Sequence, residues 1–376
     1  MRRILPLLAV LASAAACSSS TAAEPAPPVV TPEVDAGPGE PEPEPPCAPP
    51  ALTFKSSPVA IAPARDHHFT MVREVSGVPY LYVLGGEKDD FTTVFGDIQR
   101  AKIAEDGSLG AFEPAGEIPN GRAGAGFAVV GDDVVLLGGV VGVPQTGFTN
   151  EILVARFSAD GKLTSWKPGP SKLPLKVQHS SAVVVGRDVY VFGGTTGNAA
   201  ATISGKVTVN ADGTLGTLVS LNELKPGRSH QAAFVAQGSV YLVGGLDKGP
   251  IGNPPSRADV VRATFQPDGA IGAWESVGKL ESPLSISAAE PVGCSVLLVG
   301  GLDDATGGPY SDRVLRGSVL KDGTFRTEKA LAATVTTARG HVHQTPVYKK
   351  FLYSVGGRGN DGSVIGNIDI GTIEHP

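Results

Sequence analysis

Six short apolar segments of this 376-residue chain each end in a pair of glycines, and successive pairs are 51 to 56 residues apart. Such regular spacing indicates a repeated structural unit. The segments at residues 80–84, 189–192 and 240–243 have four or five residues and are rich in β-branched and aromatic side chains. They are too short for helices and therefore predict buried strands. The pairs are Gly85-Gly86, Gly138-Gly139, Gly193-Gly194, Gly244-Gly245, Gly300-Gly301 and Gly356-Gly357.

Each repeat contains four strand-like segments. A first strand and a second strand, such as residues 179–186 and 188–192, are separated by a tight turn, and the glycine pair ends the second. A polar loop leads to a third and a fourth strand, which are joined by Asp-Gly in five copies, the strongest short hairpin signal. Four antiparallel strands in a unit of this size predict the blade of a β-propeller.

The two ends of the repeat region complement each other. The sixth copy ends after a third strand, residues 368–373, so its fourth strand is missing. Residues 51–55, which precede the first copy, match the fourth strand of the other copies. Pairing these segments would close the ring and leave no open edge between the first and last blades. The sequence therefore predicts an all-β, six-bladed propeller whose last blade is closed by an N-terminal strand.

These glycine pairs resemble those of the kelch family of β-propellers, and the resemblance covers residues 51–376. The usual aromatic residue of the third kelch strand is Ile, Phe or Val here, and the following turn is Asp-Gly, so the chain looks like a bacterial variant. The resemblance implies the fold but leaves the activity open, because kelch propellers include protein-binding scaffolds, sialate mutarotases and the copper enzyme galactose oxidase.

The first 50 residues indicate export. Arg2 and Arg3 precede an apolar stretch that is too short to span a bilayer, so residues 1–16 are typical of a signal peptide. Small residues before Cys17 resemble a bacterial lipobox, which implies lipidation of Cys17 and, with Ser18 next to it, an outer-membrane lipoprotein on the periplasmic or cell-surface side. Ordinary signal cleavage nearby is the alternative. Residues 17–50 are rich in proline and acidic residues and predict a disordered tether, and residues 51–376 form the propeller.

Charge restricts the partners. The whole chain has a net charge of −6, of which the propeller carries about −2. Nucleic-acid binding normally needs a basic face, so no nucleic acid is expected. Contact with a membrane is expected through the lipid anchor only. The expected partner is an envelope or extracellular protein, or an anionic glycan.

Two cysteines remain once Cys17 is lipidated. Cys47 lies just before the closing strand, and Cys294 lies at the tip of the first hairpin of the fifth copy. Strand directions place both on the same face in adjacent blades. In an oxidising compartment this pair predicts a disulfide, and two free thiols are the alternative.

The opposite face is expected to carry any ligand site. Basic residues precede the first strand in five copies, including Lys176, and in four of these copies a histidine follows two or three residues later. Loops after the glycine pairs bring Asp and Asn residues to the same face. The candidate residues for a ligand or partner face are Arg65, His67, Arg122, His179, Arg228, His230, Arg339 and His341.

Two interpretations of these residues stay open. In the structural one, each arginine pairs with an acid or amide of a neighbouring loop, and the histidines satisfy backbone groups. In the functional one, a cationic mouth lined with imidazoles binds an anionic sugar or an acidic peptide. A metal site from His67, His230 and His341 is not expected, because different blades would hold these residues too far apart for bonds near 2 Å.

No nucleophile motif or phosphate loop is present, so no catalytic residues and no cofactor are expected. The sequence favours a non-catalytic binding or scaffolding propeller on a lipoprotein. The alternative is a carbohydrate-active propeller, either similar to the sialate mutarotases or sugar-binding, in which Arg65, Arg228 or Arg339 would hold a sugar carboxylate beside a histidine.

Overall fold

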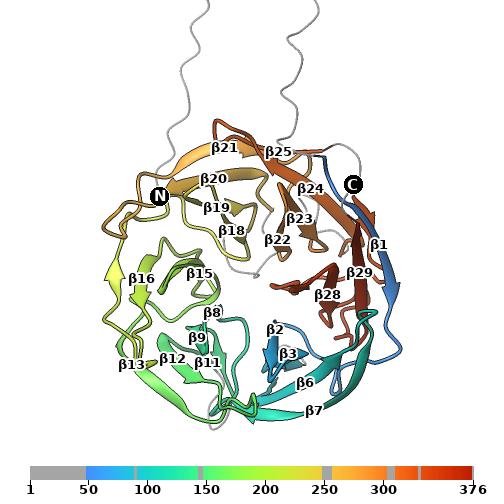
Figure 1. The fold of residues 1–376 in the computed structure, drawn as a ribbon. Coiled ribbons are helices and arrows are strands. Elements are labelled where there is room, and N and C mark those ends of the chain that lie inside the picture. Colours follow the sequence, from blue (N-terminus) through green and yellow to red (C-terminus); the bar gives the residue numbers. More distant parts are fainter. Residues whose placement is uncertain are drawn as a thin grey trace, which may run out of the picture. The chain divides into compact units, whose positions relative to one another are not determined.

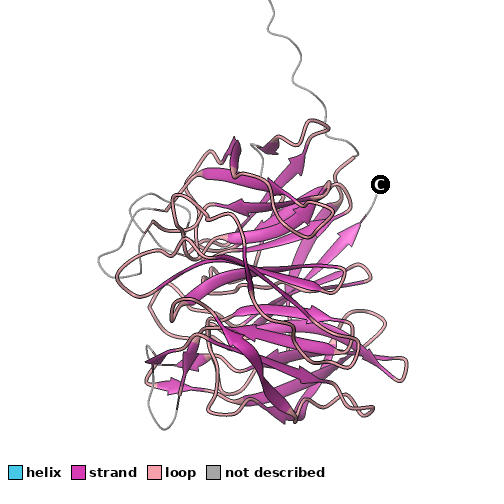
Figure 2. Ribbon diagram, turned by 90° about the vertical axis from the view of Figure 1, so that its left-hand side faces the viewer, coloured by secondary structure: helices cyan, strands magenta, loops and turns pink. Residues whose placement is uncertain are grey.

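The computed structural model describes residues 48–88, 91–142, 147–247, 256–302, 310–328 and 332–374. The regular elements in these ranges are strands joined by turns and loops (Figure 2). Within them, no helix has the length and hydropathy needed to cross a membrane. The predicted signal peptide, Cys17, Cys47 and nearly all of the tether lie outside the described residues.

Six four-stranded antiparallel cores are arranged around a central axis, which confirms the six-bladed β-propeller (Figure 1). The first strand of each blade lies nearest the axis. From the axis outward, the first blade consists of β2 (Phe69–Val75), β3 (Val78–Leu84), β6 (Asp97–Ile103) and β7 (Leu109–Glu117), and the second of β8 (Gly126–Val130), β9 (Asp133–Leu137), β12 (Glu151–Arg156) and β13 (Trp166–Lys172). The third blade consists of β14 (Gln178–Val185), β15 (Asp188–Thr195), β16 (Ser204–Thr208) and β17 (Val219–Ser220), and the fourth of β18 (Ala232–Ala236), β19 (Ser239–Val243), β20 (Asp259–Thr264) and β21 (Glu275–Lys279). The fifth blade consists of β22 (Ala288–Val292), β23 (Ser295–Val299), β24 (Arg313–Val319) and β25 (Phe325–Thr327), and the sixth of β27 (Val347–Tyr348), β28 (Phe351–Val355), β29 (Ile368–Glu374) and β1 (Ala51–Ser56).

Short additional strands decorate this ring. β26 (Ala333–Thr334) pairs with β24 in the fifth blade. Two small ribbons follow the first and second glycine pairs, and they are formed by β4 (Glu87–Lys88) with β5 (Thr93–Val94), and by β10 (Val140–Val141) with β11 (Gly147–Phe148).

The ring closes as the sequence predicts. β1 lies antiparallel to β29, with Ala51 opposite Glu374 and Ser56 opposite Asp369. Leu52 is buried against Leu297 of the fifth blade and Leu352 of the sixth. The N-terminal strand therefore supplies both backbone pairing to the last blade and apolar surface to the seam beside it.

Each glycine pair lies where the backbones of two adjacent blades approach closely. Both glycines of every pair have positive φ, between 56° and 104°, which side chains disfavour. A Cβ on Gly85 would lie 2.2 Å from the Arg122 carbonyl oxygen of the next blade, and the Gly86 N–H donates to that same oxygen at 2.9 Å. The repeated glycines are therefore required by backbone approach between blades.

Six hydrophobic clusters hold the ring together, one at each seam between adjacent blades. Tyrosine at the third position before a glycine pair adds a polar contact across four of these seams. In each case its hydroxyl donates to the glycine carbonyl of the Asp-Gly turn in the following blade. These pairs are Tyr82–Gly161 (2.8 Å), Tyr190–Gly269, Tyr241–Gly323 and Tyr353–Gly107 (each 3.0 Å). The Asp-Gly turns thus serve as docking points between blades as well as hairpins.

Candidate functional site

The four arginines predicted at the binding face are buried and ion-paired. Their exposed fractions are 0–1 %, and each donates to a carboxylate at the start of the third strand of its own blade. The shortest N–O distances are Arg65–Asp97 2.7 Å, Arg122–Glu151 3.5 Å, Arg228–Asp259 2.8 Å and Arg339–Asp369 2.8 Å. Because these charges are already neutralised inside the blades, the arginines do not form a cationic mouth.

The same arginines also connect backbone groups. Arg65 Nη1 donates to the Gly85 carbonyl at 2.9 Å, and the Arg65 carbonyl accepts from the Gly357 N–H of the preceding blade at 3.0 Å. Arg122, Arg228 and Arg339 repeat both contacts. The geometry therefore supports the structural interpretation of the arginines.

Two blades lack this arginine. In the fifth blade the equivalent residue is Leu284, as the sequence indicates, since its carbonyl accepts from Gly245. In the third blade it is Val177, whose carbonyl accepts from Gly139. The assignment of Lys176 to this position is therefore wrong by one residue, and the basic residue recurs in four blades rather than five.

A ring of left-handed residues surrounds the axis at this end of the propeller. One residue per blade has a φ between 52° and 61°, and the six are His67, Gly124, His179, His230, Ile286 and His341. Each of the first five donates its backbone N–H to the carbonyl of the equivalent residue in the preceding blade, at 2.7–3.3 Å. The left-handed backbone conformation is strained for residues other than glycine. The closed propeller therefore holds five non-glycine residues in a conformation that they rarely adopt.

This backbone ring gathers imidazoles at the axis. His67 lies 4.1 Å from His341 and 4.7 Å from His179, measured between ring centroids, and His179 stacks on His230 at 3.6 Å. His343 also reaches the cluster, with its ring 5.9 Å from that of His67. The four predicted histidines are thus gathered in one cluster. His67 and His341 approach each other although they belong to different blades, but His230 is not in the group of close ligand atoms that they form with His343, so the set His67, His230 and His341 is not brought together as a metal site.

Most of these imidazoles are uncharged. Burial, followed by the neighbouring imidazoles, holds the pKa of His179 and of His341 well below the usual value. For His230, burial and then the His343 and His67 rings lower the pKa in the same way. Burial also lowers the pKa of His343 to about 3. These rings are therefore neutral near pH 7, and each has one nitrogen able to accept a hydrogen bond or bind a metal.

His67 has a different environment. Its Nδ1 lies 2.8 Å from Asp66 Oδ1 and 3.3 Å from Glu87 Oε1, and both carboxylates are fully buried. Arg358 donates to the same two carboxylates, at 2.7 Å and 2.8 Å. Although burial opposes protonation, Asp66 and Glu87 raise the pKa of His67 to about 9. Asp66, whose pKa burial alone would raise, is held by His67 well below its usual range.

A small polar cavity of about 130 Å³ lies on the axis beside this cluster. It is bordered by the innermost segments of five blades. The lining residues are Ala125, Phe127, Ser180, Ser181, Ala182, Gln231, Ala232, Ala233, Ala289, Glu290, His343 and Gln344. Ser180 Oγ, Gln231 Oε1 and His343 Nε2 have no hydrogen-bond partner among the described residues. Such unpaired buried groups are costly and usually indicate a bound water or ligand.

The first strand of the sixth blade is short, which helps to open this cavity. β27 has only two residues, because the segment before it contains Pro346, which has no N–H to donate to β28. Residues 341–345 therefore lie outside the sheet and present His343 and Gln344 to the cavity.

Among the described residues, Glu290 is the only acidic one in the cavity lining. It is half-buried, and no ion pair or hydrogen bond engages it in the described part of the chain. Burial raises the pKa of its carboxyl to about 8, so Glu290 holds a proton at pH 7 and can donate a hydrogen bond.

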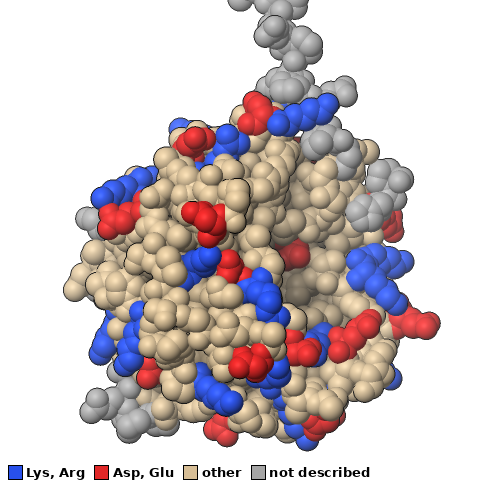
Figure 3. Space-filling view, turned by 60° about the vertical axis from the view of Figure 1, so that its left-hand side comes forward, with Lys and Arg blue, Asp and Glu red and all other residues tan. Residues whose placement is uncertain are grey.

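A larger depression of about 580 Å³ lies between the sixth and first blades and includes Pro63, Lys88, Arg358 and Ser363 in its lining. Its main cation, Arg358, is already bonded to Asp66 and Glu87. On the face in view in Figure 3, Lys and Arg are interspersed with Asp and Glu, without an extended area of one sign. We therefore regard the axial cavity, with its unpaired polar groups, as the stronger candidate site.

Cys294 lies in the turn between β22 and β23, where the sequence places it, and is disulfide-bonded. Cys47 is outside the described residues. The pairing of Cys47 with Cys294 therefore stays a prediction.

The comparisons with known proteins support the fold. No protein-family model matches the chain, and no curated protein matches it. Among solved structures, "Structure of YjhT" matches with a TM-score of 0.63 and 12% sequence identity, and the match covers 85% of this chain and 99% of that one. Together with the six blades, this likeness supports the β-propeller fold of the chain.

Several residues of the site are missed by the sequence interpretation. Asp66, Glu87 and Arg358 look like ordinary surface charges in the sequence, and only the closed ring brings them to His67. Glu290 had a signal that an alignment of the repeats could have found. It occupies the position four residues after the left-handed residue, where the first four blades have Met71, Ala128, Val183 and Phe234.

Proposed function

We propose that the propeller binds a small, uncharged polar ligand of the sugar class in the axial cavity. The observation that carries this proposal is a set of unpaired polar groups facing one cavity, namely Ser180 Oγ, Gln231 Oε1 and the Glu290 carboxyl. Sugar hydroxyls donate and accept hydrogen bonds, so they can satisfy both kinds of group.

The charge of the cavity selects against anionic ligands. Arg65, Arg228 and Arg339, which could otherwise bind a sugar carboxylate, are buried against Asp97, Asp259 and Asp369. Among the described residues, the cavity lining contains no lysine or arginine that could bind an anion. A neutral sugar is therefore a better fit than the anionic glycan expected from the sequence.

The test is a titration of the purified protein with a panel of neutral and anionic monosaccharides and disaccharides, followed by saturation-transfer NMR. We expect at least one neutral sugar to bind, and Glu290→Met to weaken that binding by tenfold or more. Glu290→Gln, which keeps a donor at this position, should weaken it less. Glu105→Gln, a change at an exposed position, is the matched control. Binding that Glu290→Met leaves unaltered, or no binding across the panel, would contradict the proposal.

Anomer exchange is a second candidate, and Glu290 is the observation that favours it. A carboxyl with a pKa of about 8 can give its proton to the sugar ring oxygen as the bond from that oxygen to the anomeric carbon breaks, and the resulting carboxylate can take the proton of the anomeric hydroxyl; the reverse transfers close the ring as either anomer. Exchange measured by NMR should accelerate with the wild-type protein and be lost with Glu290→Gln. Because Arg228 is paired with Asp259, Glu290 is a more direct test of this activity than Arg228. If Glu290→Gln binds sugar and wild-type exchange equals that in buffer, the propeller is a binding module only.

We also propose that the propeller is displayed in the cell envelope on a lipid attached to Cys17. The charged start, short apolar stretch and small residues before Cys17 support this location. Incorporation of labelled fatty acid that is abolished by Cys17→Ser would test it. A pull-down from envelope extracts tests whether a protein partner, the remaining alternative, binds the propeller.

A further inference from the structure

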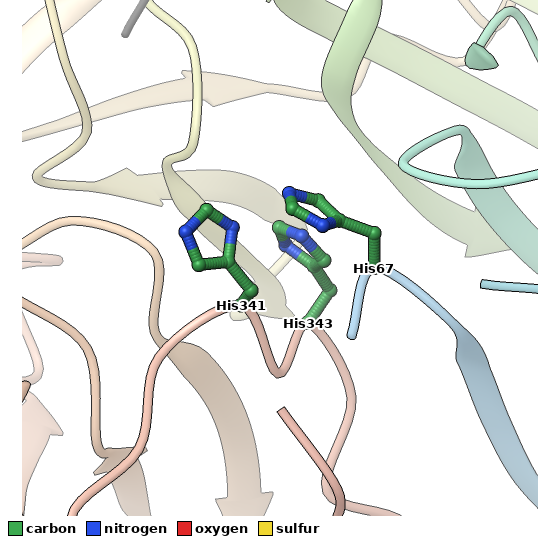
Figure 4. Close-up of side chains that lie close together, drawn as sticks. All are labelled: His67, His341 and His343. Atoms are coloured by element: carbon green, nitrogen blue, oxygen red, sulfur yellow. The ribbon is translucent and has the colours of Figure 1, made fainter. Parts of the chain in front are cut away.

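Three histidines at the axis have two features of a metal site: their ring nitrogens lie close together, and one nitrogen of each ring has no hydrogen-bond partner among the described residues. His67 lies just before β2, the first strand of the first blade, whereas His341 and His343 lie in one segment before β27 of the sixth blade (Figure 4). Their rings lie side by side, and one ligand nitrogen from each can be chosen so that all three lie within 4.8 Å of one another. His67 is 2% exposed, and the other two are half-buried.

The free nitrogens are defined by what the other nitrogens do. His67 Nδ1 is bonded to Asp66 Oδ1 at 2.8 Å, and His341 Nε2 lies 2.9 Å from the Tyr310 hydroxyl. The remaining atoms, His67 Nε2 and His341 Nδ1, have no partner among the described residues, nor has His343 Nε2. Three unpaired nitrogens in one buried cluster are costly unless something binds them.

The distances suit a metal ion after a small contraction. Tetrahedral zinc with Zn–N bonds of about 2.0–2.1 Å separates neighbouring nitrogens by about 3.3 Å. The ligand nitrogens lie within 4.8 Å of one another, and rotations of the imidazoles can bring them to the shorter separation, because His341 and His343 belong to a segment outside the sheet. A second imidazole pair, His179 with His230, stacks face to face beside the three and does not belong to this group.

The groups behind the ligands also match known metal sites. Histidine ligands usually donate their second nitrogen to a carboxylate or another acceptor, which orients the ring and increases its basicity. Asp66 provides this contact for His67, and Arg358 holds Asp66 in place through a 2.7 Å bond. The Tyr310 hydroxyl provides the equivalent contact for His341.

We propose that His67, His341 and His343 bind one divalent transition-metal ion of the zinc class, and that His67 releases the proton on its Nε2 to solvent when the metal binds. All three ligands are imidazoles, a set that suits zinc, copper, nickel or iron. Three protein ligands leave one tetrahedral position for water or another ligand. His343 also lines the axial cavity, so a metal at this site would lie beside the cavity. The metal site is independent of the sugar proposal, since either can exist without the other.

The test is isothermal titration of the tag-free, chelator-treated protein with zinc chloride, together with cobalt(II) absorption spectra. We expect one zinc per chain and the visible absorption of tetrahedral cobalt. His343→Ala should weaken zinc binding by a hundredfold or more, and Asp66→Asn by ten- to hundredfold. His230→Asn, in which asparagine tolerates the left-handed backbone, is the matched control and should change the affinity by less than threefold.

Folding is checked separately by circular dichroism and by thermal unfolding in chelator. If His67→Ala fails to fold, His343→Ala still tests the proposal, because His343 is half-buried and outside the sheet. The proposal would be overturned if the titration showed no saturable zinc binding with a dissociation constant below about 10 µM, a limit that holds to within a factor of about ten. Equal losses from His343→Ala and His230→Asn would also overturn it, since they would indicate non-specific binding to the imidazoles.

Discussion

Replacing Glu290 with glutamine should stabilise the protein, and the gain should grow with pH. Glu290 occupies a position that holds an apolar residue in the first four blades, and burial raises the pKa of its carboxyl from 4.5 to about 8. The folded protein therefore binds the Glu290 proton more tightly than the unfolded chain does. The free energy of unfolding that depends on this group is largest below pH 4.5 and falls until the pH passes 8.

The size of the effect follows from these two pKa values. Relative to a neutral group of the same shape, the wild-type carboxyl lowers the unfolding free energy by about 1 kcal/mol at pH 5 and about 3 kcal/mol at pH 7. Above pH 8 the difference approaches about 5 kcal/mol. Glu290→Gln should remove this dependence, because the amide does not ionise.

The assay is urea unfolding at pH 5, 7 and 9, followed by the fluorescence of the two tryptophans. The difference between variant and wild type isolates Glu290 from the other titrating groups. Glu105→Gln, at an exposed position, should give a difference near zero at all three pH values. A difference for Glu290→Gln that stays constant from pH 5 to pH 9, or that decreases, would refute the reasoning.

Three further predictions concern the fold. Arg339→Met leaves the fully buried Asp369 without its partner, so we expect a loss of about 3–5 kcal/mol in urea unfolding, and a loss below 1 kcal/mol would contradict the pairing. Leu52→Ala should cost about 2–3 kcal/mol because Leu52 is 7% exposed in the seam of the last blade, whereas the exposed Thr53→Ala should change stability little. Cys294→Ser removes a disulfide and should cost about 2–4 kcal/mol. Non-reducing peptide mapping that finds Cys294 joined to a residue other than Cys47 would contradict the predicted pairing.

The repeat pattern was sufficient to predict the fold because each of its signals is local. Positive φ and close backbone approach require glycine wherever a second strand ends against the next blade, so Gly85 and its equivalents recur in phase. The Asp-Gly turns mark the third hairpin for the same reason. The closing strand was predictable because the sixth repeat lacks a fourth strand and the chain has one extra strand before the first repeat. Pairing the extra strand with the third strand of the sixth repeat leaves neither with an open edge.

The site depended on distances that no local signal contains. The sequence indicated that arginines and histidines share one face, but the depth of each side chain follows from the closure of six blades around one axis. Closure buries Arg65 against Asp97 and leaves it unable to bind a ligand, while it brings His67 within 4.1 Å of His341. Residue type and order thus determined the architecture, whereas tertiary packing decided which polar groups were paired and which were left facing the axis, because pairing depends on contacts between segments far apart in the chain.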